Sequence, residues 1–254
     1  MIGCIIQARL GSTRLPGKVM RKINDETPML KFQLEQLQSS NLIDKKIIAT
    51  TILPADDLIA NFCKENGIEY FRGESNDVLD RYYNCAKTFQ FSTIVRITSD
   101  NPLIDPFIVD NVIAKFMNSK YDYASTDLKT YPLGFAVEIF SFEALEKSWK
   151  ETTLPSEREH VTPYFFKNKE IFRQNNFPYK ENYSHIRCTV DTEFDFKLIQ
   201  EIILKINSRP IHLHDVLKLY KKEPEIFQIN KHVKHDGYER SLKEDKEFLE
   251  KKEN

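Results

Sequence analysis

The sequence predicts an α/β protein with a mostly parallel sheet and helices on both faces. Short apolar segments alternate with longer segments that repeat apolar residues every three or four positions. Alternation of this kind is typical of parallel sheets, because each parallel strand needs a crossover connection. The chain has 254 residues, of which 41% are hydrophobic and 30% charged, which is ordinary for a globular protein.

Strands and helices alternate over the first part of the chain. Apolar runs predict strands over residues 2–7, 46–51, 68–71 and 93–97. Helical spacing, as at Leu30, Leu34 and Leu37, predicts helices over residues 28–40, 55–66, 76–89 and 106–117. Gly67 follows the second helix as a C-terminal cap would, and Pro106 opens the fourth.

The pattern is less regular after about residue 120. Strands are predicted over residues 121–125, 135–140 and 186–190, and helices over residues 141–150, 156–169 and 192–206. Thr192 and Asp195 form a capping-box pattern at the start of the last helix. We find no repeat and no linker, so we expect one domain over residues 1–234 with a lobe at about 120–183. The charged tail, residues 235–254, is expected to be a helix or to be disordered.

Composition excludes several function classes. The formal net charge of −1 gives no electrostatic case for nucleic acid or an anionic membrane. Apolar runs are too short to span a membrane, and the N-terminus lacks the pattern of a signal peptide. The four cysteines are scattered without a CxxC pair, which predicts reduced and mostly buried thiols. We therefore expect a cytoplasmic protein that binds neither nucleic acid nor membranes.

Three polar clusters follow predicted strands. The loop QARLGSTRLPGK, residues 7–18, combines two glycines with two arginines and a lysine. It is not a standard P-loop, because five residues separate Gly11 from Gly17 and Val19 follows Lys18. Acidic clusters follow at residues 96–106 (RITSDNPLIDP) and 186–195 (IRCTVDTEFD). Ligands of such sheets bind at the carboxyl ends of strands, where this combination suits a nucleoside triphosphate with magnesium. A solvated basic turn is the alternative.

These segments resemble the cytidylyltransferase family of CMP-Kdo and CMP-neuraminate synthetases, and in particular its SpsF-like branch from spore coat polysaccharide biosynthesis. The resemblance continues through FRGESNDVLDRY, VRITSDNPLIDP, EREHVTPY, VDTEFD and INKHVKHDGYERSL, and covers roughly residues 1 to 245. It implies a Rossmann-like nucleotide-diphospho-sugar transferase fold with a small dimerisation lobe, and therefore a homodimer. The many aromatic residues between 120 and 183 fit either that lobe or a secondary core.

The resemblance also implies residue roles. Arg14 and Lys18 would neutralise the triphosphate and the departing pyrophosphate, and with Asp100 and Asp191 they would form the catalytic set. Asp100 and Asp191 would hold Mg²⁺. Sugar contacts would come from Glu159 and His160. The nucleotide would be bound by Ala8, Arg9, Gly11, Ser12, Arg14, Lys18, Arg72, Asp77, Arg81 and Asp100.

Each assignment has a structural alternative. Asp100 could start a turn, and Asp191 could be favoured by the dipole of the helix that follows it. Arg81 could pair with Asp77 along one helix, Glu159 could be the capping-box partner of Ser156, and His160 could be a satisfied helix histidine. The sequence also departs from the better-known synthetases, which have Gly where this chain has Ser99 and Gln where it has His160.

The predicted reaction is CTP-dependent. An acceptor hydroxyl, expected on an acidic nonulosonate-type sugar, attacks the α-phosphorus and releases pyrophosphate, giving a CMP-sugar for surface polysaccharide biosynthesis. One alternative is a sugar-1-phosphate or phosphonate nucleotidyltransferase that uses CTP or GTP. Another is a glycosyltransferase or nucleotide-sugar-binding protein on the same fold.

Overall fold

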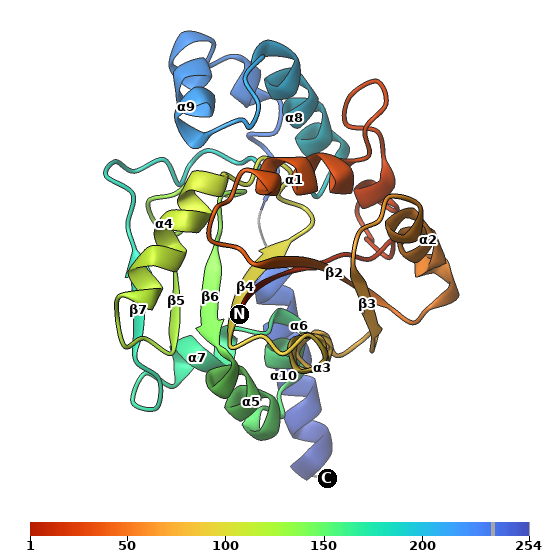
Figure 1. The fold of residues 1–254 in the computed structure, drawn as a ribbon, viewed down its shortest axis with the longest axis vertical. Helices are drawn as coiled ribbons and strands as arrows, with labels where there is room; N and C mark the ends of the chain where they lie inside the picture. Colours follow the sequence, from red (N-terminus) through yellow and green to blue (C-terminus); the bar gives the residue numbers. More distant parts are fainter. Residues whose placement is uncertain (235–236, 254) are drawn as a thin grey trace.

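A seven-stranded mixed sheet forms the centre of the protein (Figure 1). The computed structural model describes residues 1–234 and 237–253. The strands are β1 (Ile2–Gln7), β2 (Lys45–Thr51), β3 (Tyr70–Gly73), β4 (Thr93–Thr98), β5 (Tyr123–Thr126), β6 (Glu138–Ser141) and β7 (Gln174–Phe177). Their order is β3-β2-β1-β4-β6-β5-β7, and β6 runs antiparallel to both of its neighbours. The predicted α/β class and mostly parallel sheet are confirmed.

Ten helices connect and cover the strands within the described residues. They are α1 (Met29–Gln38), α2 (Asp57–Glu65), α3 (Val78–Thr88), α4 (Pro106–Met117), α5 (Phe142–Glu151), α6 (Pro155–His160), α7 (Pro163–Lys167), α8 (Glu193–Lys205), α9 (Leu213–Lys222) and α10 (Gly237–Glu253). Short 3₁₀ turns lie at Lys18–Met20, Pro54–Asp56 and Ile226–Gln228. Gly67, with φ +64°, follows α2 as predicted.

The two faces of the sheet bury separate apolar cores. Side chains alternate along a strand, so Cys4 and Ile6 of β1 pack on one face and Ile5 on the other. The first face is covered by α1, α2, α4, α8 and α9, and the second by α3, α5 and α7. All four cysteines are buried free thiols, as the sequence predicted.

The prediction of a strand over residues 186–190 is wrong. This segment is extended, but its backbone bonds join loops instead of a neighbouring strand. Cys188 N donates to Leu133 O at 2.7 Å, and Val190 N donates to Asp100 O at 2.8 Å. Arg187 makes an isolated bridge with Leu133. The segment therefore ties the turn after β4 to the loop before β6.

Other elements also differ from the prediction. The helix predicted over residues 156–169 is two short helices, because Val161 has φ +71° and Pro163 opens a new helix. The sequence reading missed β7 and α9. Strands of the segment at about 120–183 extend the main sheet, while its role in dimerisation stays a prediction. The described part of the C-terminal tail is a helix, α10, which packs beside α6 (Figure 1).

No helix within residues 1–234 and 237–253 has both the length and the apolar character needed to cross a membrane.

Candidate active site

A cavity of about 560 Å³ opens at the carboxyl ends of β1 and β4. These strands are neighbours, with Gln7 paired to Thr98, and the chain order reverses between them. Such a switch point is where ligands bind in open α/β sheets. The predicted site residues that line the cavity are Ala8, Arg9, Gly11, Ser12, Arg14, Lys18, Arg81, Asp100, Glu159, His160 and Asp191.

The loop after β1 is anchored at several points. Leu10 N donates to Asp56 Oδ1 at 2.7 Å, and Gly17 N donates back to Leu10 O at 3.0 Å. Gly17 has φ +68°, a conformation that favours glycine. Leu15 and Val19 are buried in the core. The anchored loop therefore presents Arg14 and Lys18 to the cavity from a fixed backbone.

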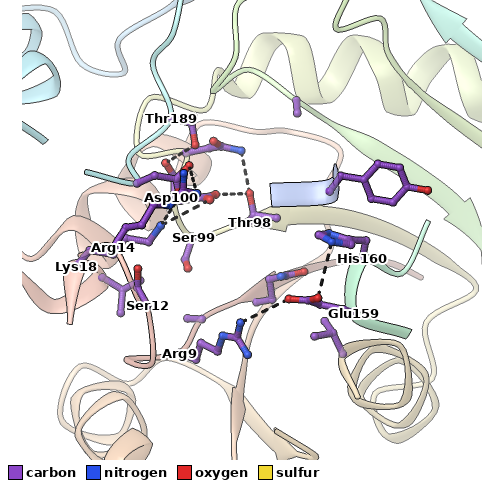
Figure 2. Close-up of a pocket in the computed structure, with 18 of the residues that line it drawn as sticks. Arg9, Ser12, Arg14, Lys18, Thr98, Ser99, Asp100, Glu159, His160 and Thr189 are labelled. Atoms are coloured by element: carbon purple, nitrogen blue, oxygen red, sulfur yellow. Dashed lines mark hydrogen bonds and ion pairs between the residues drawn. The ribbon is translucent and has the colours of Figure 1, made fainter. Parts of the chain in front are cut away.

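Lys18 brings the two predicted metal aspartates together. Its ammonium lies 3.0 Å from Asp191 Oδ1 and 3.8 Å from Asp100 Oδ2, and it donates to Val190 O at 2.6 Å. Figure 2 shows Lys18, Arg14 and Asp100 converging on one side of the cavity. Asp100 does stand in a turn, as the structural alternative proposed, but its side chain also lines the cavity.

Asp191 is surrounded by cations. Arg14 lies 3.1 Å and Arg187 2.8 Å from Oδ2, in addition to Lys18 at Oδ1. Burial alone would raise the pKa of Asp191, but Lys18, Arg14 and Arg187 outweigh it and lower the pKa. Asp191 is therefore an ionised carboxylate near neutral pH, and two of its three cations, Arg14 and Lys18, line the cavity.

A buried polar network supports Asp191 on the side facing the protein interior. Arg187 Nε donates to Asp195 Oδ1 at 2.8 Å, and Asn230 Nδ2 donates to the same oxygen at 2.8 Å. Asp195 Oδ2 accepts from the backbone N–H groups of Asp191 and Thr192. Thr192 is the N-cap of α8 and Asp195 its capping-box partner, as predicted. This network fixes the backbone that carries the Asp191 carboxylate.

Glu159 and His160 lie on α6 across the cavity from Lys18 (Figure 2). Ser241 of α10 donates to Glu159 Oε2 at 3.0 Å and lies 2.7 Å from His160 Nε2. Arg9 is 3.8 Å from Glu159 Oε1. The proposed capping box is wrong, because Leu154 is the N-cap of α6 and Ser156 hydrogen-bonds Asp245 instead. Burial, the largest influence, lowers the pKa of His160, so the ring is neutral at pH 7.

Buried polar atoms without partners mark the cavity floor. Among the described residues, Gln7 Oε1, Arg81 Nε and Arg96 Nε are buried and have no hydrogen-bond partner. All three residues line the cavity. Arg81 is only 1% exposed and its Nη1 donates to Glu74 O at 2.7 Å. Buried groups of this kind are expensive to leave unpaired, so they favour a polar ligand in the cavity.

Two predicted nucleotide-binding residues do not line the cavity. Arg72 lies 2.6 Å from Asp57 and donates to the backbone oxygens of Thr51 and Leu53. Asp77 is the N-cap of α3, and its other oxygen accepts from Arg158 Nε at 2.7 Å. Asp77 thus pairs with Arg158, and the alternative of a helix pair between Asp77 and Arg81 is not seen among the described residues. Both side chains instead join structural elements, Arg72 through Asp57 and Asp77 through Arg158.

The sequence reading missed several residues of this region. Arg96 lies inside a predicted strand. A charged residue is unusual there, and this could have marked Arg96 as a candidate site residue. Arg187 contacts Asp191 directly, and Asn230 acts through Asp195; no local pattern reveals either role. Three lining residues come from α10, at a spacing that fits one face of a helix: Tyr238, Ser241 and Glu244.

The residues present fit a magnesium ion only together with a phosphate ligand. The structure shows no group of three or more His, Cys, Asp or Glu side chains placed for a metal within its described ranges. Mg²⁺ is usually held by one or two carboxylates plus phosphate oxygens and water. Asp100 and Asp191 supply two carboxylates at one wall, and a triphosphate would supply the rest while drawing Arg14 and Lys18 toward itself.

Comparison with known proteins agrees with this geometry. The cytidylyltransferase family profile matches residues 3–232. An uncharacterised protein of Methanocaldococcus jannaschii is 39% identical over 92% of this chain and 96% of its own length. The spore coat polysaccharide biosynthesis protein SpsF of Bacillus subtilis is 31% identical over 87% and 94% of the two chains. A 3-deoxy-manno-octulosonate cytidylyltransferase of Trichlorobacter lovleyi is 32% identical over 46% of each chain.

A solved structure shows the same fold. The cytidylyltransferase of Leptospira borgpetersenii is 36% identical, with a TM-score of 0.86, over 92% of this chain and 99% of its own. The nucleotidyltransferase fold expected from the sequence is thereby confirmed. The chain belongs to the cytidylyltransferase family and is a nucleotidyltransferase.

Proposed function

We propose that the protein transfers a cytidylyl group from CTP to a hydroxyl of an acidic, nonulosonate-type sugar and releases pyrophosphate. The observation that carries this proposal is the convergence of Arg14, Lys18, Asp100 and Asp191 in one cavity. Cations that can hold phosphates stand beside carboxylates that can hold a metal. Nucleotidyl transfer needs both, because its catalysis is mostly positioning and neutralisation of phosphate charge.

Arg14 and Lys18 would bind the triphosphate. In the structure both contact Asp191. A triphosphate carries more negative charge than one carboxylate, so it would attract both side chains over a short distance. As pyrophosphate departs, the same two cations would stabilise the charge that develops on it. Arg187 remains beside Asp191 throughout, because Asp195 and Asn230 hold it from the buried side.

Asp100 and Asp191 would hold Mg²⁺ when the triphosphate is present. The bound ion would neutralise phosphate charge. It would also lower the pKa of an acceptor hydroxyl that binds to it. Two contacts hold the Asp100 carboxylate beside the cavity. It accepts a hydrogen bond from Thr98 Oγ1, and its second oxygen faces Lys18.

The acceptor assignment is supported by the relatives and by the cavity. SpsF is named for spore coat polysaccharide biosynthesis, and the Trichlorobacter lovleyi relative is named as a cytidylyltransferase of 3-deoxy-manno-octulosonate, an acidic sugar. Arg9 and Arg81 line the cavity and could receive an acceptor carboxylate, whereas Arg96 is already paired with Glu138. We therefore propose a role in surface polysaccharide biosynthesis.

The test is pyrophosphate release with each of four nucleoside triphosphates. Acceptors should include N-acetylneuraminate, 3-deoxy-manno-octulosonate and a neutral sugar 1-phosphate. We expect release with CTP and an acidic sugar, and its loss in Asp100→Asn. Release with the sugar 1-phosphate but with no acidic sugar would replace this proposal with the phosphorylated-acceptor alternative.

A further inference from the structure

Within the motif INKHVKHDGYERSL, the reaction described so far uses Asn230, which hydrogen-bonds Asp195, but no residue of α10. The described C-terminal part of the motif opens α10, which lies beyond residues 3–232, the segment shared with the family profile. Yet Tyr238, Ser241 and Glu244 of this helix line the cavity. A helix that follows the segment matched by the family profile thus forms part of the wall of the cavity.

Polar contacts hold α10 against α6. The Asp245 carboxylate, 6% exposed, accepts from the backbone N of Ser156 at 2.8 Å and from its hydroxyl at 2.6 Å. Ser241, 4% exposed, contacts Glu159 and His160. These two attachments fix the height and rotation of the helix relative to the cavity.

Ser241 also orders the two sugar-facing residues. Because its hydroxyl donates to Glu159, it can accept from the neutral His160 ring, and this assigns the proton of His160 to Nε2. Removing the hydroxyl would take away the hydrogen bond that links Glu159 to His160 and leave Glu159 with Arg9 and His160 with the Tyr238 ring. Ser241 is therefore a positioning residue that acts through Glu159 and His160.

The wall has a definite chemical character. Glu244 is exposed, lines the cavity, and directly precedes the anchored Asp245. Glu159 faces the same cavity from α6. Carboxylates accept hydrogen bonds, so this side suits hydroxyl and amino groups. The arginines Arg9 and Arg81 suit an anion, and the unpartnered, buried Nε of Arg81 indicates that a polar ligand completes the cavity.

We propose that α10 is the acceptor-selecting wall of the active site, in which Glu244 and Glu159 receive the hydroxyl or amino groups of the acceptor and Ser241 positions Glu159 and His160. The inference rests on the proposed function. The inference extends the proposed function, because it assigns to the C-terminal helix the binding of the part of the acceptor that is remote from the reacting oxygen.

The test compares Glu244→Gln, Ser241→Ala and Ser241→Thr with the control Glu239→Gln. Glu239 is an exposed glutamate of the same helix that does not line the cavity. Steady-state pyrophosphate release is measured with CTP and whichever of N-acetylneuraminate and 3-deoxy-manno-octulosonate the wild type uses better. Loss of a charge-assisted bond should raise the acceptor KM about tenfold in Glu244→Gln. The KM for CTP should change less than about twofold.

Ser241→Ala should also raise the acceptor KM. Ser241→Thr should keep the acceptor KM near the wild-type value, because threonine keeps the hydroxyl. Glu239→Gln should match the wild type. An unchanged acceptor KM in Glu244→Gln, or an equal rise in the KM for CTP, would overturn the acceptor-wall assignment while the proposed function stands. Wild-type protein that releases no pyrophosphate with either acidic sugar would contradict the proposed function, and the inference with it.

Discussion

Lys18 offers the sharpest test, because the structure gives it two separable roles. In the structure it ties the loop after β1 to Asp191, and in the reaction it would hold the triphosphate. Lys18→Met keeps most of the aliphatic stem and removes the charge. A purely structural lysine would affect only stability, whereas a phosphate-binding lysine would also affect turnover.

The loss of stability can be worked out from its contacts. Lys18 is 8% exposed and donates to Val190 O and Asp191 Oδ1. One charge-assisted bond of this kind contributes about 1.5–3 kcal/mol. Asp191 keeps Arg14 and Arg187, so the larger penalty for leaving a buried charge unpaired does not apply. At about 2–4 °C per kcal/mol for a chain of this size, Tm should fall by roughly 3–12 °C.

In Lys18→Met, kcat should fall by much more than the modest loss of stability could explain. Removing one group that stabilises developing charge typically costs about 10²–10³ in kcat. Pyrophosphate release at 25 °C, where the variant remains folded, measures this directly, and thermal melting measures stability. Lys22→Met is the matched control, since Lys22 is exposed and the charge change is identical. A Tm drop in Lys18→Met with kcat/KM within about threefold of wild type would refute the phosphate-binding role and leave Lys18 a structural residue.

The remaining predictions concern the carboxylates, the loops and the assembly. The lowered pKa of Asp191 stabilises the fold above the ordinary carboxyl pKa of about 3.9, and this is lost as pH falls through the lower folded value. Asp191→Asn should therefore be less stable than wild type to urea at pH 7, and the gap should narrow as pH falls from about 5 to about 2; a constant gap would contradict this. Chelation by EDTA should abolish pyrophosphate release and Mg²⁺ should restore it, whereas activity in EDTA would exclude the metal proposal. Gly134→Ala should destabilise the protein, because Gly134 has φ +106° and an added Cβ would lie 2.6 Å from the carbonyl carbon of Cys188. Gly11→Ala should melt like wild type, since its Cβ would meet nothing within 4 Å; equal melting of both variants would refute that reasoning. Light scattering at micromolar concentration should give a homodimer, and a monomer would remove that prediction.

Local patterns in the sequence determined the elements that position the site. Apolar periodicity located β1, β4, α4 and α8 closely, because burial on one face imposes a fixed spacing on each element. The capping box at Thr192 and the glycine after α2 are local hydrogen-bonding and backbone requirements, so they too could be seen in advance. The loop with Arg14 and Lys18 stood out because its charge and glycines directly follow a buried strand.

Tertiary structure alone decided which of these residues meet. Asp191 reaches Lys18 because residues 186–190 hydrogen-bond to two loops, and such irregular pairing has no periodic signature. Arg72 and Asp77 do not line the cavity, because Arg72 pairs with Asp57 and Asp77 pairs with Arg158. The sequence suggested a charged tail after residue 234, but only packing against α6 brings Ser241 beside Glu159 and His160. Spacing along the chain determines what one element buries, whereas contacts between distant segments depend on how the elements pack together.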